Sequence, residues 1–243
     1  MTKSDFLRLA AENFEKNGIS QFATDEILSK LFDLCNIFLE ANEKMNLTAI
    51  KDEKLMISRH FADCLIPASF FPVGTNVLDV GSGGGMPTLP LAIARPDLKI
   101  TALDATAKKT AYIENTARVL GLSNVSVVTG RAEELASSAL RASFDVVTAR
   151  AVAQTNVLLE LCVPFLKPGG VFVCLKGKNG AEEAATAEIA AKTLGCAIVE
   201  SRDFVLIDPD GEKSERRVLI YKKTRDTDKI YPRKYANILK KPL

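Results

Sequence analysis

The sequence has no run of about 18 uninterrupted apolar residues, the length at which a segment becomes a candidate membrane-spanning helix. Its N-terminus, MTKSDFLRLAAENFEKNG, is charged and amphipathic, and it lacks the apolar core of a signal peptide. With 243 residues, 47% of them hydrophobic, the chain is long enough to bury a substantial core. We therefore expect a soluble, cytoplasmic protein with one main domain.

Patterns typical of metal sites and disulfides are also missing. Histidine occurs once, at His60, and the five cysteines never form a CxxC pair. A zinc site or a disulfide framework needs more ligands or closer pairs than this. A lone histidine is more often a structural hydrogen bonder than a catalyst. We expect no metal, and buried, reduced thiols at Cys35, Cys64, Cys162, Cys174 and Cys196.

The formal net charge of +2 hides an asymmetry along the chain. Residues 211–243 hold 11 Lys and Arg against 4 Asp and Glu, whereas residues 1–70 hold 8 against 11 and residues 71–210 hold 13 against 15. A basic tail on a nearly neutral body indicates a phosphate-rich partner, although such a tail also aids solubility. We predict that the tail binds this partner through Arg233, Lys234, Lys240 and Lys241.

The apolar pattern changes near Pro72-Val73-Gly74. Before this point, apolar residues at helical spacing predict helices over residues 4–17, 25–42 and 52–69. After it, short β-branched runs alternate with helical stretches, which indicates βαβ units on a parallel sheet. The predicted strands are residues 76–80, 99–104, 125–129, 144–149, 170–176, 196–206 and 216–222, with a helix at 181–194.

The last two predicted strands are joined by the turn-rich Asp208-Pro209-Asp210-Gly211. This connection is too short for a crossover helix, so the two strands must be antiparallel. A parallel sheet that ends in an antiparallel hairpin is the arrangement of Rossmann-like methyltransferases. We predict an α/β fold with a Rossmann-like class I methyltransferase sheet over residues 71–223, an α-helical N-terminal extension over 1–70, and a basic tail over 224–243.

The strongest chemical signal lies where the first strand ends, in Val77-Leu78-Asp79-Val80-Gly81-Ser82-Gly83-Gly84-Gly85-Met86-Pro87. Glycines at such a turn let the backbone bend sharply and approach a ligand closely. The GxGxxG pattern of nicotinamide enzymes needs glycine at position 86, where this chain has methionine. GxGxG after an acid fits a loop around the methionine and ribose of S-adenosylmethionine. We predict that Gly81, Ser82, Gly83 and Met86 bind this cofactor, with a ligand-free glycine turn as the alternative.

Two further loops follow neighbouring strands of the predicted sheet. Asp104 ends the second strand, where Rossmann-type folds place a carboxylate that binds the ribose hydroxyls. Ala132 and Glu133 follow the third strand, and we predict that they bracket the adenine. Structural alternatives stay open, because Asp also caps helices and Glu favours the first turn of a helix.

The fourth strand ends in Thr148-Ala149-Arg150-Ala151-Val152, at the edge where ligands bind in such sheets. The chain lacks the Asp/Asn-Pro-Pro-aromatic run of exocyclic-amine methyltransferases and the Pro-Cys pair of cytosine-C5 enzymes. Arg150 also stands where a ribose 2′-oxygen methyltransferase needs an Asp. The remaining acceptor is a ring nitrogen such as guanine N7, which needs no deprotonation. Arg150 would then hold the cofactor carboxylate or the guanine O6, with a surface salt bridge as its alternative, and no catalytic side chain is assigned.

Over nearly its whole length the chain resembles the RsmG family, also called glucose-inhibited division protein B. The resemblance rests on Asn46-Leu47-Thr48, Arg59-His60-Phe61-x-Asp63, the glycine loop, GRAEE, FDVVTARAVA, Pro232-Arg233-Lys234 and Lys241-Pro242-Leu243. It implies a bacterial guanine-N7 methyltransferase that acts on 16S rRNA or the small ribosomal subunit. It also implies cofactor contacts at Gly81, Met86, Ala132 with Glu133, and Arg150. On the substrate side, His60 joins Arg233 and Lys234 as a candidate.

The chain departs from the family at Thr88, where glycine is usual, and in Tyr235-Ala236-Asn237-Ile238-Leu239, where an Ala-Gly-x-Pro-like turn is usual. Both departures leave the GxGxG pattern intact. Other functions stay open at this point: methylation of another nucleic-acid or small-molecule acceptor, a nicotinamide-dependent oxidoreductase, and an RNA-binding module without catalysis. The sequence does not fix the oligomeric state, and a monomer is the expectation.

Overall fold

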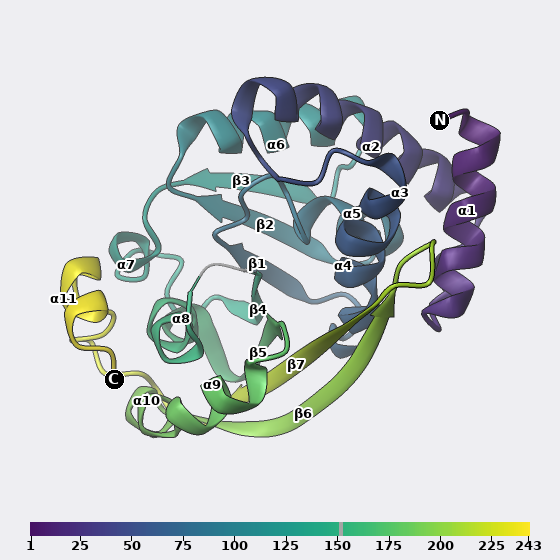
Figure 1. The fold of residues 1–243 in the computed structure, drawn as a ribbon. Coiled ribbons are helices and arrows are strands. Elements are labelled where there is room, and N and C mark those ends of the chain that lie inside the picture. The colour runs from purple at the N-terminus through teal and green to yellow at the C-terminus, as the bar shows by residue number, and fades with distance from the viewer. Residues whose placement is uncertain (151–152) are drawn as a thin grey trace.

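A seven-stranded mixed sheet forms the centre of the computed structural model, which describes residues 1–150 and 153–243 (Figure 1). The strands lie in the order β3-β2-β1-β4-β5-β7-β6. Neighbours from β3 to β5 are parallel, whereas β7 is antiparallel to both β5 and β6. The strand bounds are β1 (Asn76–Val80), β2 (Lys99–Asp104), β3 (Val125–Thr129), β4 (Phe144–Arg150), β5 (Leu166–Lys176), β6 (Cys196–Ile207) and β7 (Lys213–Lys223).

The predicted fold class is confirmed, including the antiparallel hairpin β6–β7. Strands β1, β2 and β3 have the predicted bounds, and the other four extend further at one or both ends. The helices are α1 (Lys3–Lys16), α2 (Asp25–Met45), α3 (Glu53–Met56), α4 (Asp63–Leu65), α5 (Thr88–Ala94), α6 (Ala107–Val119), α7 (Ala132–Leu135), α8 (Thr155–Cys162), α9 (Gly180–Thr186), α10 (Glu188–Leu194) and α11 (Tyr235–Lys240).

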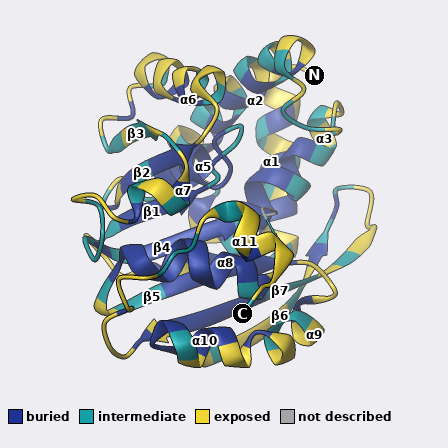
Figure 2. Cartoon of the chain, turned by 90° about the vertical axis from the view of Figure 1, so that its left-hand side faces the viewer, coloured by how far each residue is buried: buried dark blue, intermediate teal, exposed yellow. Residues whose placement is uncertain are grey.

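Both faces of the central strands β1 and β4 are buried. Val146 of β4 belongs to the apolar cluster that includes residues of α1, α2, α5 and α6, whereas the next residue, Val147, belongs to the cluster that includes residues of α8 and α10. Figure 2 shows the central strands buried and the outer faces of the helices exposed. Two-sided burial explains why these strands appear in the sequence as continuous apolar runs and not as alternating ones.

Two predicted helices are interrupted in the structure. The helix predicted over 52–69 consists of α3, a π-helical segment (Ile57–Ala62), α4 and a 3₁₀ turn (Ile66–Phe70). The helix predicted over 181–194 is broken at the fully buried Ala187, whose backbone (φ −91, ψ 0) separates α9 from α10. Alanine favours helices, so tertiary packing and not local propensity decides this break.

The tip of the β6–β7 hairpin is fastened to the N-terminal extension, and Figure 1 shows it beside α1. The Asn13 and Asn17 side-chain amides donate to the carbonyl of Ile207 at 2.8 and 2.9 Å. The buried Asp208 carboxylate accepts from the Ser58 hydroxyl at 2.6 Å and from Arg59 Nη2 at 2.6 Å. These contacts place the π-helical segment, which carries His60, over the sheet.

The C-terminal residues pack against the sheet domain. Arg141 donates to the main-chain carbonyls of Thr227, Asp228 and Tyr231. The buried Lys223 Nζ donates to two carbonyls at the end of the α8 segment, 2.7 Å from Leu166 O and 3.2 Å from Val163 O. Lys223, one charge of the basic stretch 211–243, is therefore used inside the protein. Within residues 1–150 and 153–243, no helix combines the length and apolar character that a membrane span requires.

Candidate active site

The glycine loop after β1 is tied to the end of β2. The amides of Gly81 and Ser82 donate to Leu103 O at 2.8 and 3.0 Å, and the amide of Gly83 donates to Asp104 Oδ2 at 2.9 Å. Gly83 has φ +55, in the left-handed region where glycine is the least strained residue. The loop therefore places Gly81, Ser82 and Gly83 next to Asp104, two groups that the sequence analysis linked only by spacing.

At two other positions of the loop, close packing inside the protein requires glycine, whether or not a ligand is bound. A Cβ on Gly84 would lie 2.7 Å from the Phe38 ring of α2, and one on Gly85 would lie 2.6 Å from the Leu89 side chain of α5. Met86 is buried in the same core. Residues 84–86 therefore pack between the N-terminal extension and α5. This packing holds residues 81–83 at the edge of the sheet.

The Asp104 carboxylate is 8% exposed and already holds two backbone groups. Oδ2 accepts from Gly83 as above, and Oδ1 accepts from the amide of Thr106 at 2.9 Å. Asp104 is not the N-cap of α6, which is Thr106, so the helix-capping alternative does not describe it. Each carboxylate oxygen has a second lone pair, so this arrangement still leaves acceptor capacity for ribose hydroxyls.

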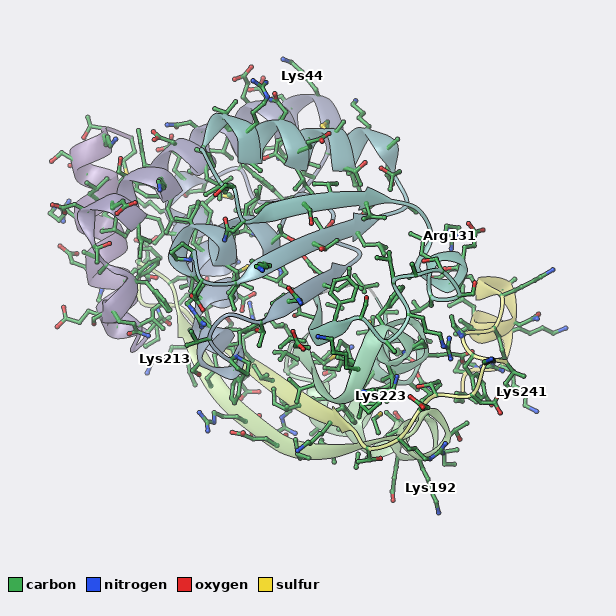
Figure 3. The ribbon with its side chains drawn as sticks, turned by 180° about the vertical axis from the view of Figure 1, so that it is seen from behind. Lys44, Arg131, Lys192, Lys213, Lys223 and Lys241 are labelled. Atoms are coloured by element: carbon green, nitrogen blue, oxygen red, sulfur yellow. The ribbon has the colours of Figure 1, made fainter. Side chains whose placement is uncertain are left out.

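The third loop brings the C-terminal segment to the predicted adenine side. Ala132 is buried, and Glu133 Oε1 accepts from Arg131 Nε at 2.5 Å. The Arg131 guanidinium in turn lies 4.8 Å from the ring centroid of Tyr235 in α11, and Figure 3 shows Arg131 beside that helix. The C-terminal tail thus contacts the side chain that pairs with Glu133.

Two buried polar atoms at the glycine loop have no hydrogen-bond partner among the described residues, Asp79 Oδ1 and Ser82 Oγ. The other Asp79 oxygen accepts from the Thr88 hydroxyl at 2.7 Å, so threonine at this unusual position has a role. Burial raises the pKa of Asp79 to about 6. Buried polar atoms are usually hydrogen-bonded. This unpartnered carboxylate oxygen and hydroxyl, beside a glycine turn, therefore fit a ligand that carries its own donors, such as the ammonium and hydroxyls of S-adenosylmethionine.

Arg150, at the end of β4, is held by the extension. Its Nη1 donates to Asp63 Oδ2 at 3.1 Å and to Arg59 O at 3.2 Å, and its Nη2 lies 3.0 Å from His60 Nδ1. The other Asp63 oxygen accepts from Arg216 Nε of β7 at 2.9 Å. The side chain of Arg150 is only 16% exposed, so the surface salt bridge weighed above does not describe it. Ala151 and Val152, the last residues of this motif, lie outside the described residues.

His60 is buried, and both of its ring nitrogens have hydrogen-bond partners. Its Nδ1 accepts from Arg150, and its Nε2 lies 3.1 Å from the Thr48 hydroxyl. Burial and, second, the Arg150 charge lower the pKa of His60 to about 3, so the ring is neutral with its proton on Nε2. At 7% exposure, His60 contacts Arg150 and Thr48 and presents little surface for a direct substrate contact.

Arg233, which the sequence predicts to bind the phosphate-rich partner, pairs with a buried carboxylate of this protein. Its Nε and Nη2 donate to the two oxygens of Glu160 at 2.8 and 2.6 Å, and its amide donates to Glu160 Oε1 at 2.8 Å. Glu160 is fully buried in α8. Arg233 therefore anchors the tail, whereas Lys234, Lys240 and Lys241 are exposed. Among the described residues, no group of three or more His, Cys, Asp or Glu is placed to hold a metal, and all five cysteines are free and buried.

Comparison with known proteins identifies the family. A family model described as rRNA small subunit methyltransferase G (GidB) matches residues 27–214. The chain is 42% identical to Ribosomal RNA small subunit methyltransferase G of Brevibacillus brevis over 100% of both chains. The chain belongs to the rRNA small subunit methyltransferase G family. A Staphylococcus aureus family member is also 42% identical, over 85% of this chain and 86% of that protein.

As a member of the rRNA small subunit methyltransferase G family, the protein is an S-adenosylmethionine-dependent methyltransferase. Solved structures agree with this at the level of fold. A SAM-dependent methyltransferase from Methanosarcina mazei covers 66% of this chain and 98% of its own, with a TM-score of 0.52 and 18% identity. The M. jannaschii TYW2 structure in complex with AdoMet covers 67% of this chain and 75% of its own, with a TM-score of 0.52 and 17% identity.

The neutral His60 predicts a specific pH dependence of stability. Its pKa is about 3 in the folded protein and about 6.5 when unfolded, so protons favour the unfolded chain and stability is lost as the pH falls below about 6.5. Between pH 7 and pH 5, wild type should lose roughly 2 kcal/mol more unfolding free energy than His60→Gln. Urea unfolding of both proteins at the two pH values measures this difference. Parallel losses would mean that His60 is not held neutral.

Proposed function

We propose that this enzyme transfers the methyl group of S-adenosylmethionine to N7 of a guanine in 16S rRNA of the small ribosomal subunit. The family membership over the full chain carries this proposal. The geometry supports it, because the glycine loop, Asp104 and the end of β4 come together at one sheet edge behind a docked helical extension. Ribosomal subunits are cytoplasmic, and we place the enzyme there.

We assign the cofactor site to residues at the ends of β1 to β4. The backbone of Gly81, Ser82 and Gly83 and the neighbouring Met86 surround the methionine and ribose, and Asp104 binds the ribose hydroxyls. Ala132 and Glu133 bracket the adenine. Arg150 binds the cofactor carboxylate or the guanine O6, and its three protein hydrogen bonds hold it in place for either. When bound, S-adenosylmethionine supplies an activated methyl group.

The residues at the end of β4 suit an acceptor that needs no general base. His60 is neutral, but both of its ring nitrogens are engaged, by Arg150 and by Thr48. Asp63 is held in ion pairs, with Arg150 on one oxygen and Arg216 on the other. Guanine N7 carries a free lone pair at neutral pH, and the protein has only to hold it in line with the methyl group.

The test uses ribosomal RNA that lacks the modification. Small ribosomal subunits, and naked 16S rRNA as a second substrate, are taken from a strain without the family enzyme and incubated with labelled S-adenosylmethionine. Nuclease digestion and mass spectrometry should find 7-methylguanosine as the product, and the two substrates show whether the particle is required. Label on a ribose, an exocyclic amine or no nucleotide would overturn the proposal.

A further inference from the structure

Beyond Arg150, the carboxyl edge of the sheet continues into two adjoining hollows. The larger, of about 490 Å³, is lined by Asp63, Arg150, Ala153, Gln154, Leu175, Lys176, Gly177, Glu183, Phe204, Arg216 and Arg217. The smaller, of about 280 Å³, shares Gly177, Phe204, Arg216 and Arg217 with it and adds Lys178, Asp203, Val205 and Glu215. We call the two together the hairpin groove, because Phe204 of β6 and Arg216 and Arg217 of β7 line both hollows. Figure 1 shows these two strands side by side. Its size lies within the range of small-ligand sites.

The walls of the hairpin groove are held by partly buried ion pairs. On one side, Asp63 joins Arg150 to Arg216. On the other, Lys176 Nζ lies 2.6 Å from Glu183 Oε2 and donates to Ala153 O at 2.7 Å. Lys176 and Glu183 thereby hold Ala153 and Thr155, respectively. A preformed groove binds a ligand without a large ordering cost.

The chemistry of the lining suits a single-stranded nucleic acid. Phe204 is half-buried and is the only aromatic side chain among the described lining residues of either hollow. Over both hollows, five cationic side chains face four carboxylates. Four of the five cations are already paired with carboxylates of the lining: Arg150, Lys176, Arg216 and Arg217. Lys178, in the smaller one, is exposed and forms no ion pair with a described residue. An aromatic face for a base beside cations for phosphates is the combination with which proteins bind unpaired strands.

We propose that the hairpin groove binds the nucleotide that adjoins the methylated guanine, with its base stacked on Phe204 and its phosphate at Lys178. The inference rests on the proposed function, since Arg150 stands at the boundary between the methyl-transfer site and the groove. A polynucleotide must continue beyond the methylated base, and the groove leads away from Arg150 across β7 and β6. Phe204 and Lys178 thus belong to RNA recognition and not to cofactor binding.

The test separates stacking from packing at Phe204. Phe204→Leu keeps an apolar side chain against the core but removes the aromatic face, and Phe204→Tyr keeps that face. A single-stranded RNA that spans the methylated guanine should bind Phe204→Leu about 5- to 150-fold more weakly than wild type, and Phe204→Tyr within about 3-fold of wild type. The KM for RNA should rise in Phe204→Leu with little change in kcat, because binding and not chemistry is affected.

Lys178→Ala tests the phosphate contact independently. It should lower the slope of log affinity against log salt by about 0.7, which Phe204→Leu should not do. Matched controls are Phe32→Ala, a half-buried aromatic on α2, and Lys99→Ala, an exposed lysine at the start of β2 on the opposite sheet edge. Neither control should change RNA affinity, and S-adenosylhomocysteine affinity should be unchanged in every variant.

Two results would overturn the inference: wild-type RNA affinity in Phe204→Leu, or equal losses in Phe204→Leu and Phe204→Tyr. An unchanged salt slope in Lys178→Ala would remove the phosphate contact. The proposed function fails separately, because it fails when the wild-type enzyme forms no 7-methylguanosine, whatever the affinities of the variants.

Discussion

Replacing Gly83 by valine is expected to abolish measurable binding of S-adenosylhomocysteine while the protein still unfolds cooperatively. Gly83 has φ +55, and a β-branched residue is strained in this region by roughly 1–3 kcal/mol. The strain is relieved only if the loop moves, which breaks the hydrogen bond from the Gly83 amide to Asp104. Displacing both the loop and the carboxylate should weaken the cofactor on the order of 100-fold or more, since each lost hydrogen bond of about 1.4 kcal/mol is a factor of ten.

Gly121→Val is the matched control for this experiment. Gly121 has φ +66 in the turn after α6, and no atom lies within 4 Å of the position that a Cβ would take there, so the same substitution causes similar strain away from the site. Calorimetry with S-adenosylhomocysteine should show normal binding for Gly121→Val and none for Gly83→Val. Normal binding by Gly83→Val would mean that the loop does not contact the cofactor.

Replacing Arg233 by alanine is expected to destabilise the protein by about 3–5 kcal/mol, because it leaves a buried carboxylate without its partner. Glu160 is fully buried and accepts three hydrogen bonds, all from Arg233. This stabilisation is large compared with that of an exposed ion pair, which contributes at most about 1 kcal/mol. Denaturant unfolding of the variant and of wild type measures the difference.

The double variant Glu160→Gln/Arg233→Ala distinguishes a structural role from an RNA contact. Glutamine carries no charge and still offers Oε1 to the amide of residue 233, so most of the lost stability should return. If Arg233 only anchors the tail, the double variant should bind RNA as wild type does. Weaker RNA binding in a stable double variant would restore Arg233 as a phosphate contact, and a double variant as unstable as Arg233→Ala would refute the buried-charge explanation.

Much of the fold could be predicted from local pattern. The strands from β1 to β3 were delimited by β-branched runs between turn residues, and the short Asp208–Gly211 connection required an antiparallel hairpin. The glycine loop and Asp104 were placed by their positions at strand ends, and the hydrogen bond between Gly83 and Asp104 joins them. Such features depend on neighbours in sequence and on the general geometry of parallel sheets.

Pairings between distant residues could not be predicted in this way. Asp63 bridges Arg150 and Arg216, which lie 87 and 153 positions away in the chain. Glu160 lies among the apolar residues of α8, and no local pattern in the sequence indicates its pairing with Arg233. The unpartnered Asp79 oxygen could not be found either, since the sequence marks an acid before the glycines but not its burial.

By itself, the sequence determined the α/β architecture, the family and the order of the loops along the sheet edge, because periodicity, glycine spacing and strand ends are local properties. Only the tertiary structure decided what the charged side chains do. His60 became a neutral partner of Arg150, and Arg233 became an anchor for the tail. The physical reason is that a charge or ring nitrogen acts through its desolvation and its partners, and both are set by residues that the fold brings from far along the chain.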